Sequence, residues 1–251
     1  RGTTGPVTSD GGARPVGEER PRAWAAPRRL APMRIGDHLD QSDVIAQAAS
    51  IGADVAQIFL GDPQSWKGPE FTFPGGAEAL KDAAAAADLE LVVHAPYVIN
   101  VASPNNRIRI PSRKLLQQIV DGAAAVGATG VVVHGGHVTA KEDPAKGFDN
   151  WRKAIDALQT DVTVYIENTA GGDFSMARRL DRIEGLWAAV QQADGAENVG
   201  FCLDTCHAWA GGIDLTTAVA DVRALTGRVA LVPLRSRLLI SEASRPCGRA
   251  E

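Results

Sequence analysis

The amino-acid sequence predicts an α/β fold, a TIM (β/α)8-type barrel with about seven of its eight units visible. Strand-like runs alternate with helix-like segments, which is the rhythm of a parallel sheet. The runs are apolar on successive residues, as at Val131, Val132 and Val133, and this is typical of strands buried on both faces. A doubly wound sheet would share these features. The barrel is favoured because at least four of the runs end in His, Glu or Asp, and a barrel brings all such ends to one mouth.

The alternation begins after Met33 and continues to residue 232. We expect strands over 34–38, 55–60, 89–94, 130–134, 163–167, 199–203 and 228–232. We expect helices over 42–51, 77–87, 112–126, 145–159, 175–193 and 215–226. Pro111 and Ser112 predict the start of the third helix, and Gly127 predicts its end because glycine accepts the left-handed cap conformation.

Composition divides the chain of 251 residues into three parts. Residues 1–32 are rich in Pro, Gly and Arg without apolar periodicity, so we expect a disordered or non-native extension. Residues 33–232 form the predicted barrel, and 233–251 form an atypical tail without a strand-then-helix rhythm. An eighth unit is not visible in that tail.

Several classes of protein are disfavoured by the composition. No apolar run approaches the ~18 residues of a membrane span, and no secretory signal is visible. Three cysteines without framework spacing predict a reduced, cytoplasmic setting and exclude a zinc ribbon. The net charge of −4 mildly opposes a nucleic-acid partner, although a local basic cluster or bound metal ions can supply the positive field. No glycine-rich phosphate loop is present.

The candidate site consists of polar residues at the ends of four successive predicted strands. A single His in such a place is more often a hydrogen-bonded structural residue, but four successive strand ends of this kind indicate a metal site. Imidazole and carboxylate ligands together suit zinc, manganese or iron. The candidate ligands are His94, His134, Glu167, Asp204 and His207.

The motifs around these residues resemble endonuclease IV, the zinc-dependent apurinic/apyrimidinic endonuclease family (AP endonuclease family 2) of base-excision repair. The resemblance covers about Met33 to Val232. The matching stretches are His94-Ala-Pro-Tyr-Val-Ile-Asn100, Val131-Val-Val-His134-Gly-Gly-His137, Ile166-Glu167-Asn-Thr-Ala-Gly171 and Leu203-Asp204-Thr-Cys-His207-Ala-Trp-Ala-Gly211. Phe59-Leu-Gly-Asp-Pro-Gln-Ser-Trp66 fits as well, and the Asp204–His207 block is the most specific.

The resemblance implies three zinc ions at the barrel mouth and hydrolysis of the phosphodiester 5′ to an abasic site in duplex DNA. His94, His134 and Glu167 then match ligands of the first ion, and Glu167, which we also take as the catalytic residue, bridges to the second. Asp204 matches a ligand of the second ion and His207 a ligand of the third. The residues that match DNA-contacting regions of the family are Gln64, Trp66, Tyr97 and Asn100. For Tyr97 and the loop 64–66, packing at the rim of the barrel is an equally open interpretation.

The chain departs from the family pattern after residue 232. The family ends its seventh strand with a His ligand, followed by an Asp-x-His pair and a Glu on the eighth strand. This chain has Pro233 at the first of these positions and no His beyond His207, so we hypothesise a truncated or frameshifted C-terminus. We therefore expect fewer than three Zn²⁺, with Mn²⁺ as an alternative, and impaired cleavage.

Two other functions stay open at this point. A divalent-metal sugar isomerase or epimerase of the xylose isomerase-like superfamily would use the same ligand types, although the Asp204–His207 block argues against it. An inactive DNA-binding remnant is the third possibility. For the enzyme we expect a monomer that binds duplex DNA containing abasic sites, has no membrane partner, and is located in the bacterial cytoplasm in association with the nucleoid.

Overall fold

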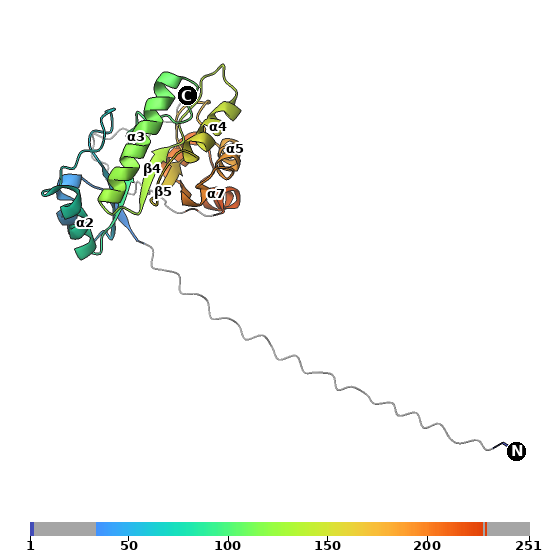
Figure 1. The fold of residues 1–251 in the computed structure, drawn as a ribbon, viewed down its shortest axis with the longest axis horizontal. Helices are drawn as coiled ribbons and strands as arrows, with labels where there is room; N and C mark the ends of the chain where they lie inside the picture. Colours follow the sequence, from blue (N-terminus) through green and yellow to red (C-terminus); the bar gives the residue numbers. More distant parts are fainter. Residues whose placement is uncertain (3–33, 228, 230–251) are drawn as a thin grey trace. The chain divides into compact units, whose positions relative to one another are not determined.

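A parallel sheet forms the centre of the computed structural model, which describes residues 1–2, 34–227 and 229 (Figure 1). Its six strands lie side by side in chain order, β1 to β6, as the alternating pattern predicts. Their bounds are β1 Gly36–His38, β2 Val55–Phe59, β3 Glu90–His94, β4 Gly130–His134, β5 Thr163–Glu167 and β6 Val199–Cys202. The parallel register sets His134 of β4 directly opposite Glu167 of β5. All six carboxyl ends therefore lie at the same edge of the sheet.

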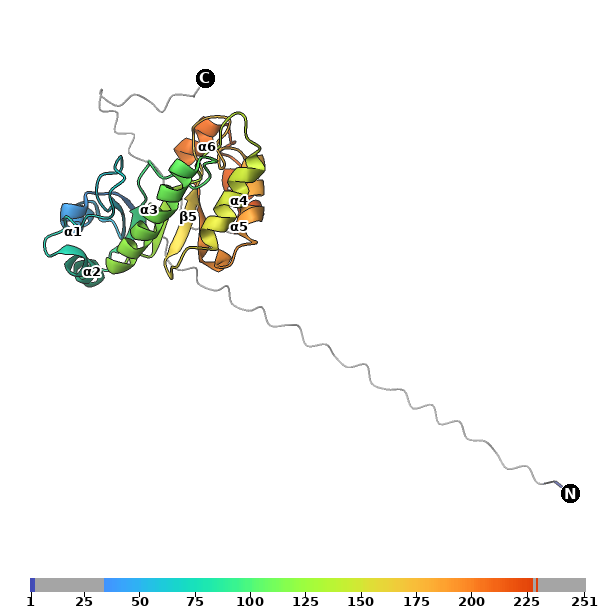
Figure 2. The ribbon, with the colours of Figure 1, turned by 45° about the horizontal axis from the view of Figure 1, so that its top comes forward.

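Helices connect the strands and follow the same order along the sheet (Figure 2). Helix α4 packs beside α5, and α5 beside α7, while α3 lies against β3 and β4. Their bounds are α1 Val44–Ile51, α2 Gly76–Ala86, α3 Asn106–Ala125, α4 Pro144–Ile155, α5 Leu180–Val190, α6 Thr205–Gly211 and α7 Ala218–Thr226, with single 3-10 turns at Gln41–Asp43 and Ala196–Asn198.

Successive side chains of a strand point to opposite faces of the sheet, so the buried side chains form two sets. Val131, Val133 and their counterparts on neighbouring strands belong to the large core that includes the helices. The alternate side chains Val92, Val132 and Cys202 form a second, smaller cluster on the other face of the sheet. Two residues after each of these three come His94, His134 and Asp204. The side chains on this face of the sheet are therefore apolar in the middle of the strands and are potential metal ligands at the carboxyl ends.

The structure corrects the start of the third helix. Helix α3 begins at Asn106 rather than at 112, because the Asn105 side chain caps it by accepting a hydrogen bond from the backbone N–H of Arg107. Pro111 lies inside the helix and forgoes one backbone hydrogen bond there. A capping Asn thus outweighs the preference of proline for the first helical turn.

Other boundaries differ from the prediction as well. The predicted helix over 175–193 begins only at Leu180, and the one over 145–159 ends at Ile155. A short helix, α6, lies between the sixth strand and the helix predicted over 215–226, where no helix was expected. Of the seventh predicted strand, 228–232, only residue 229 is described. The predicted extension 1–32, apart from its first two residues, and the tail 233–251 also lie outside the described residues.

Among the residues that the structure describes, none of the helices is long and apolar enough to cross a membrane. The composition led to the same expectation.

Candidate metal centre

The polar residues predicted at the strand ends do come together. His94, His134 and Glu167 are the last residues of β3, β4 and β5, and Asp204 follows β6 by two residues. His207 lies on α6, one helical turn beyond Asp204. These residues form two groups of three, and within each group one potential ligand atom from every residue lies within 4.8 Å of the other two. These groups are His94–His134–Glu167, called the first cluster below, and Glu167–Asp204–His207, called the second cluster.

The first cluster is assembled by the sheet itself. Glu167 Oε2 lies 3.3 Å from Nε2 of His94 and 3.5 Å from Nε2 of His134. Glu167 and His94 are buried, with 3% and 5% of their surface exposed, whereas His134 retains more solvent access. Both ligand histidines thus direct the same ring nitrogen at one oxygen of one carboxylate.

The tautomer of His94 tests whether a cation fits the first cluster. Its Nδ1 lies 2.7 Å from the carbonyl oxygen of Ala95, which can only accept a hydrogen bond, so Nδ1 carries the proton. In the neutral ring Nε2 then presents a lone pair to the Glu167 carboxylate. Two acceptors facing each other repel, and a bound cation converts both into ligands. The donor set therefore fits a metal ion.

The second cluster depends on a helix cap. The Asp204 side chain accepts a hydrogen bond from the backbone N–H of His207 at 2.7 Å, which caps α6. Asn168 is fully buried and fixes Asp204 from the other side, donating from Nδ2 to the Asp204 carbonyl at 2.9 Å and accepting from its backbone N–H at 2.6 Å. The carboxylate of Asp204 is thereby held in a set orientation beside Glu167.

His207 completes the second cluster through its Nδ1 atom. That atom lies 3.0 Å from Glu167 Oε1 and 2.9 Å from the Asn168 carbonyl oxygen. Because both partners are acceptors, Nδ1 holds the proton, and Nε2 is the atom with a lone pair to offer. His207 therefore braces the Glu167 carboxylate with one nitrogen and can bind an ion with the other.

Burial and hydrogen bonding set the charges of these groups. Burial raises the pKa of Glu167, but the hydrogen bond from His207 and the contacts with the His94 and His134 rings outweigh it and lower that pKa to about 2. Burial lowers the pKa of His134 to about 4. Burial also lowers the pKa of His207, but the Glu167 hydrogen bond reverses this and leaves the pKa raised. At neutral pH an ionised Glu167 thus faces a neutral His134, which are the forms that bind metal.

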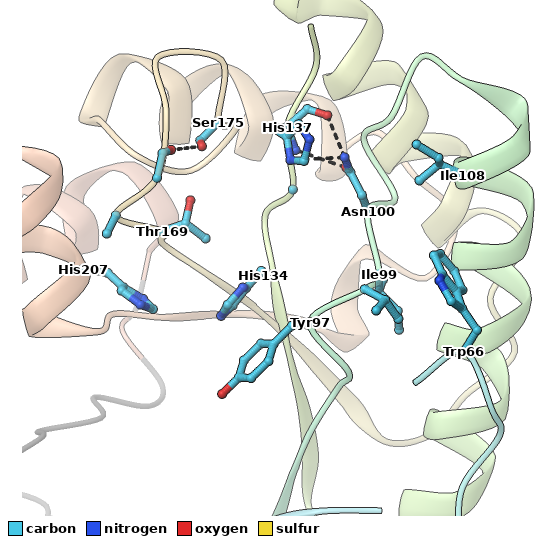
Figure 3. A pocket seen from close by; sticks show the side chains of 14 residues that line it. Trp66, Tyr97, Ile99, Asn100, Ile108, His134, His137, Thr169, Ser175 and His207 are labelled. Carbon is cyan, nitrogen blue, oxygen red and sulfur yellow. Dashed lines mark hydrogen bonds between the residues drawn. The ribbon is translucent and has the colours of Figure 1, made fainter. Parts of the chain in front are cut away.

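A pocket of about 530 Å³ opens beside the two clusters (Figure 3). His134 and His207 line it on the side of the clusters, and Trp66 and Ile108 line the opposite wall. Tyr97 is 41% exposed at its edge, and ring contacts of 5.2 and 5.4 Å between centroids join it to His94 and His134. The pocket thus joins the candidate metal ligands to an aromatic rim.

The four predicted DNA-contacting residues lie in different surroundings. Trp66 is 48% exposed and Gln64 is also exposed, on a loop joined to the Tyr97 loop by a hydrogen bond between the Tyr97 N–H and the Pro63 carbonyl. Asn100 is buried, and both atoms of its amide bond to His137. Contact with DNA stays a prediction for all four residues.

Sequence reasoning missed Asn168 and did not predict α6. Asp204 followed eight residues later by Gly212 is the usual pattern of a capped short helix, with the glycine in the left-handed region at φ 87°. That signal was available in the sequence. The sequence gives no comparable signal for Asn168, because its role depends on its hydrogen bonds to the backbone of Asp204, which only the structure shows.

Comparisons with known proteins show the family to which the chain belongs. The family model of the xylose isomerase-like TIM barrel matches residues 45–232, which confirms the predicted barrel. The probable endonuclease 4 proteins of Mycobacterium tuberculosis and Mycobacterium leprae are each 56% identical over 200 residues, covering 80% of this chain and 75% of theirs. The chain belongs to the endonuclease IV family.

Solved structures extend the likeness of this endonuclease IV family member. The crystal structure of endonuclease IV from Thermus thermophilus matches with a TM-score of 0.65 and 27% identity, covering 80% of this chain and 75% of that one. A D-tagatose 3-epimerase-like protein matches with a TM-score of 0.63 at 18% identity, over the same shares of the two chains. The second likeness shows a shared barrel fold and carries no information on substrate.

Proposed function

We propose that this protein is a metal-dependent endonuclease that hydrolyses the phosphodiester 5′ to an abasic site in duplex DNA. The observation that carries the proposal is the pair of ligand clusters joined by Glu167 at the carboxyl edge of the sheet, in a member of the endonuclease IV family. The names of the related proteins support a DNA substrate, and the preference for abasic sites rests on the resemblance of the motifs.

Zinc is the metal that we propose for both clusters, because His and carboxylate ligands suit it and the tautomer of His94 leaves a lone pair directed at Glu167. His94, His134 and Glu167 would hold one ion, while Glu167 and Asp204 would hold a second. His207 would contribute its Nε2 to a further ion, and Mn²⁺ stays an alternative for all of them. Bound ions of this kind supply Lewis acidity toward phosphoryl oxygens and make water a better nucleophile at neutral pH.

The protein's own groups place the substrate and hold the charges. Glu167 stays ionised because of its low pKa, so it supplies the shared negative charge that both clusters need. Asn168 and the α6 cap keep Asp204 oriented before substrate arrives. Trp66 and Tyr97 offer exposed aromatic faces at the pocket, and stacking of a base on such a face contributes about 1–3 kcal/mol.

The ligand count of the sequence predicts reduced activity. The five histidines of the chain include none after His207, so the additional His ligands of the family pattern have no counterpart in 208–251. The first ion would keep three protein ligands, the second ion two (Glu167 and Asp204) and the third ion only His207. We therefore propose fewer than three ions per chain and slow cleavage. The monomeric state and the cytoplasmic, nucleoid-associated location stay predictions.

A nicking assay tests the proposal. Purified protein loaded with Zn²⁺ is incubated with an end-labelled duplex containing one abasic site, with an intact duplex of the same sequence as control. We expect a slow cut on the 5′ side of the abasic site, abolished by EDTA and restored by zinc, and no cut in the intact duplex. A metal analysis of the same sample gives the number of ions.

Two results would overturn the proposal. Metal-dependent epimerisation of a ketohexose by a protein that leaves the abasic duplex uncut would place the chain among the sugar enzymes. Three zinc ions per chain and rapid cleavage would contradict the proposed loss of ligands, although they would keep the reaction.

A further inference from the structure

His137 lies in the pocket beside the metal clusters but belongs to neither of them. It follows β4 by three residues, where Gly136 turns the chain with a φ of +69°. A side chain at Gly136 would meet the Asn100 amide oxygen at 2.4 Å, so the turn brings the backbone close to Asn100. The His137 side chain is exposed to the pocket (Figure 3).

The Asn100 amide fixes the orientation of His137 through three hydrogen bonds. Its Oδ1 accepts from the backbone N–H of His137 at 3.1 Å, and its Nδ2 donates to the His137 carbonyl at 3.0 Å. These two backbone contacts determine which end of the amide is nitrogen, because an N–H requires an acceptor and a carbonyl requires a donor. Nδ2 is therefore the atom that lies 3.2 Å from His137 Nδ1.

The protonation of the His137 ring follows from this assignment. Since Nδ2 of Asn100 can only donate, Nδ1 of His137 must accept and carries no proton. A neutral ring then bears its proton on Nε2, the nitrogen farther from Asn100. No hydrogen-bond partner of Nε2 occurs in the described part of the chain, so this N–H remains available to a ligand in the pocket.

The lining of the pocket indicates that the ligand is an anion. The fourteen lining residues found among the described positions include three histidines but no Asp or Glu. Thr169 adds a buried hydroxyl that no described group pairs with. An acid-free wall with neutral donors suits a phosphodiester.

We propose that His137 is a phosphate-binding residue, held by Asn100 in the tautomer that donates its Nε2–H to a backbone phosphate of the bound DNA. The assignment rests on the proposed function for the identity of the ligand. Asn100, predicted from the sequence to contact DNA, becomes a positioning residue that acts through His137. Its amide has no hydrogen left for the substrate, because both are used on His137.

The tautomer is tested first, in the zinc-loaded protein, by long-range ¹H–¹⁵N correlation spectra of the histidine rings. The His137 signals are assigned by their loss in His137→Gln. We expect an unprotonated Nδ1 and a protonated Nε2, and a shift of the Nε2–H resonance on titration with inorganic phosphate. A proton on Nδ1 in the wild-type protein would overturn the inference. In Asn100→Asp the new carboxylate oxygen accepts where Nδ2 donated, so the proton is expected to move to Nδ1.

The binding role is tested with a duplex that contains a tetrahydrofuran analogue of the abasic site, by fluorescence anisotropy, with a gel to show that the DNA stays intact. Loss of a hydrogen bond to a charged acceptor predicts about ten- to a hundredfold weaker binding by His137→Phe, with partial recovery in His137→Gln. The salt dependence should keep its slope, since a neutral donor releases no counterion. Gln192→Ala, on the turn after α5, is the matched control and should bind like the wild type.

The outcomes separate this inference from the proposed function. Equal duplex affinity of His137→Phe and the wild type, or a shallower salt slope in the variant, would overturn the role of His137 as a neutral donor. A wild-type protein that binds no duplex, while inorganic phosphate still shifts the His137 Nε2–H resonance, would overturn the DNA substrate and support the anion site.

Discussion

The first and second clusters meet at one carboxylate but are constructed in different ways. The first takes each ligand from the last residue of a strand, so hydrogen bonding within the sheet sets its geometry. The second takes only Glu167 from a strand, and its other two ligands depend on the cap of α6 and on the Asn168 amide. A strand register is a rigid support, whereas a helix cap contributes only about 1 kcal/mol. The first cluster should therefore tolerate perturbation that the second does not.

Replacement of Glu167 by Gln should have the largest effect, because it affects both clusters at once. The amide keeps the size of the side chain but removes the charge that His94, His134 and His207 face. We expect loss of metal at both clusters and a fall in abasic-site cleavage of about 10³-fold or more. Metal analysis after dialysis and the nicking assay measure the two effects.

Glu184→Gln on the exposed side of α5 is the matched control, since it removes one carboxylate elsewhere on the fold. It should keep the wild-type metal content and rate. Retention of bound zinc by Glu167→Gln at the wild-type level would show that the two clusters do not share this ligand.

In the metal-free protein, the two clusters should differ in how the free energy of unfolding depends on pH. The pKa of His134 falls from 6.5 to about 4 on folding. Between these values the unfolded chain binds the proton and the folded chain does not, so the stability falls as the pH falls. From pH 7 to 5 this group should cost about 2 kcal/mol. Urea unfolding in EDTA at both pH values, compared with His134→Gln, isolates the effect, because the variant lacks it.

His207 in the second cluster should behave in the opposite sense. Its pKa is raised on folding, so its stabilisation is fully present below pH 6.5 and is lost as the pH rises through the folded pKa. A His207→Gln variant should therefore lose more stability, relative to wild type, at pH 5 than at pH 8. The same relative loss at both pH values would contradict the Glu167–His207 contact.

The two clusters also differ in how far the sequence predicts them. His94, His134 and Glu167 end apolar runs, and the parallel sheet that such runs predict brings strand ends together, so their proximity follows from pattern alone. The sequence pattern also predicts that Asp204 lies at the barrel mouth, but it does not predict the helix α6 that follows Asp204. It could not show that His207 turns back to Glu167, nor that Asn168 holds Asp204. These contacts depend on side-chain direction, which periodicity does not determine.

The smallest predicted effect is on stability. It distinguishes the role of Asp204 as a helix cap from its role as a metal ligand. Asp204→Asn keeps an oxygen that accepts from the His207 N–H, so the metal-free protein should lose little stability. Asp204→Ala removes the cap as well and should cost about 1 kcal/mol more, measured by urea unfolding in EDTA. Both variants should weaken metal binding at the second cluster and leave the first cluster filled.

Asp143 provides the matched control, because it caps α4 by accepting from the Ala145 N–H at 2.9 Å and belongs to neither cluster. Asp143→Ala should cost about the same free energy of unfolding as loss of the Asp204 cap, without any change in metal content. If Asp204→Asn destabilised the metal-free fold as much as Asp204→Ala, the charge rather than the cap would be what holds α6 in place. The second cluster would then resemble the first, with Asp204 fixed by its electrostatic surroundings instead of by a helix end.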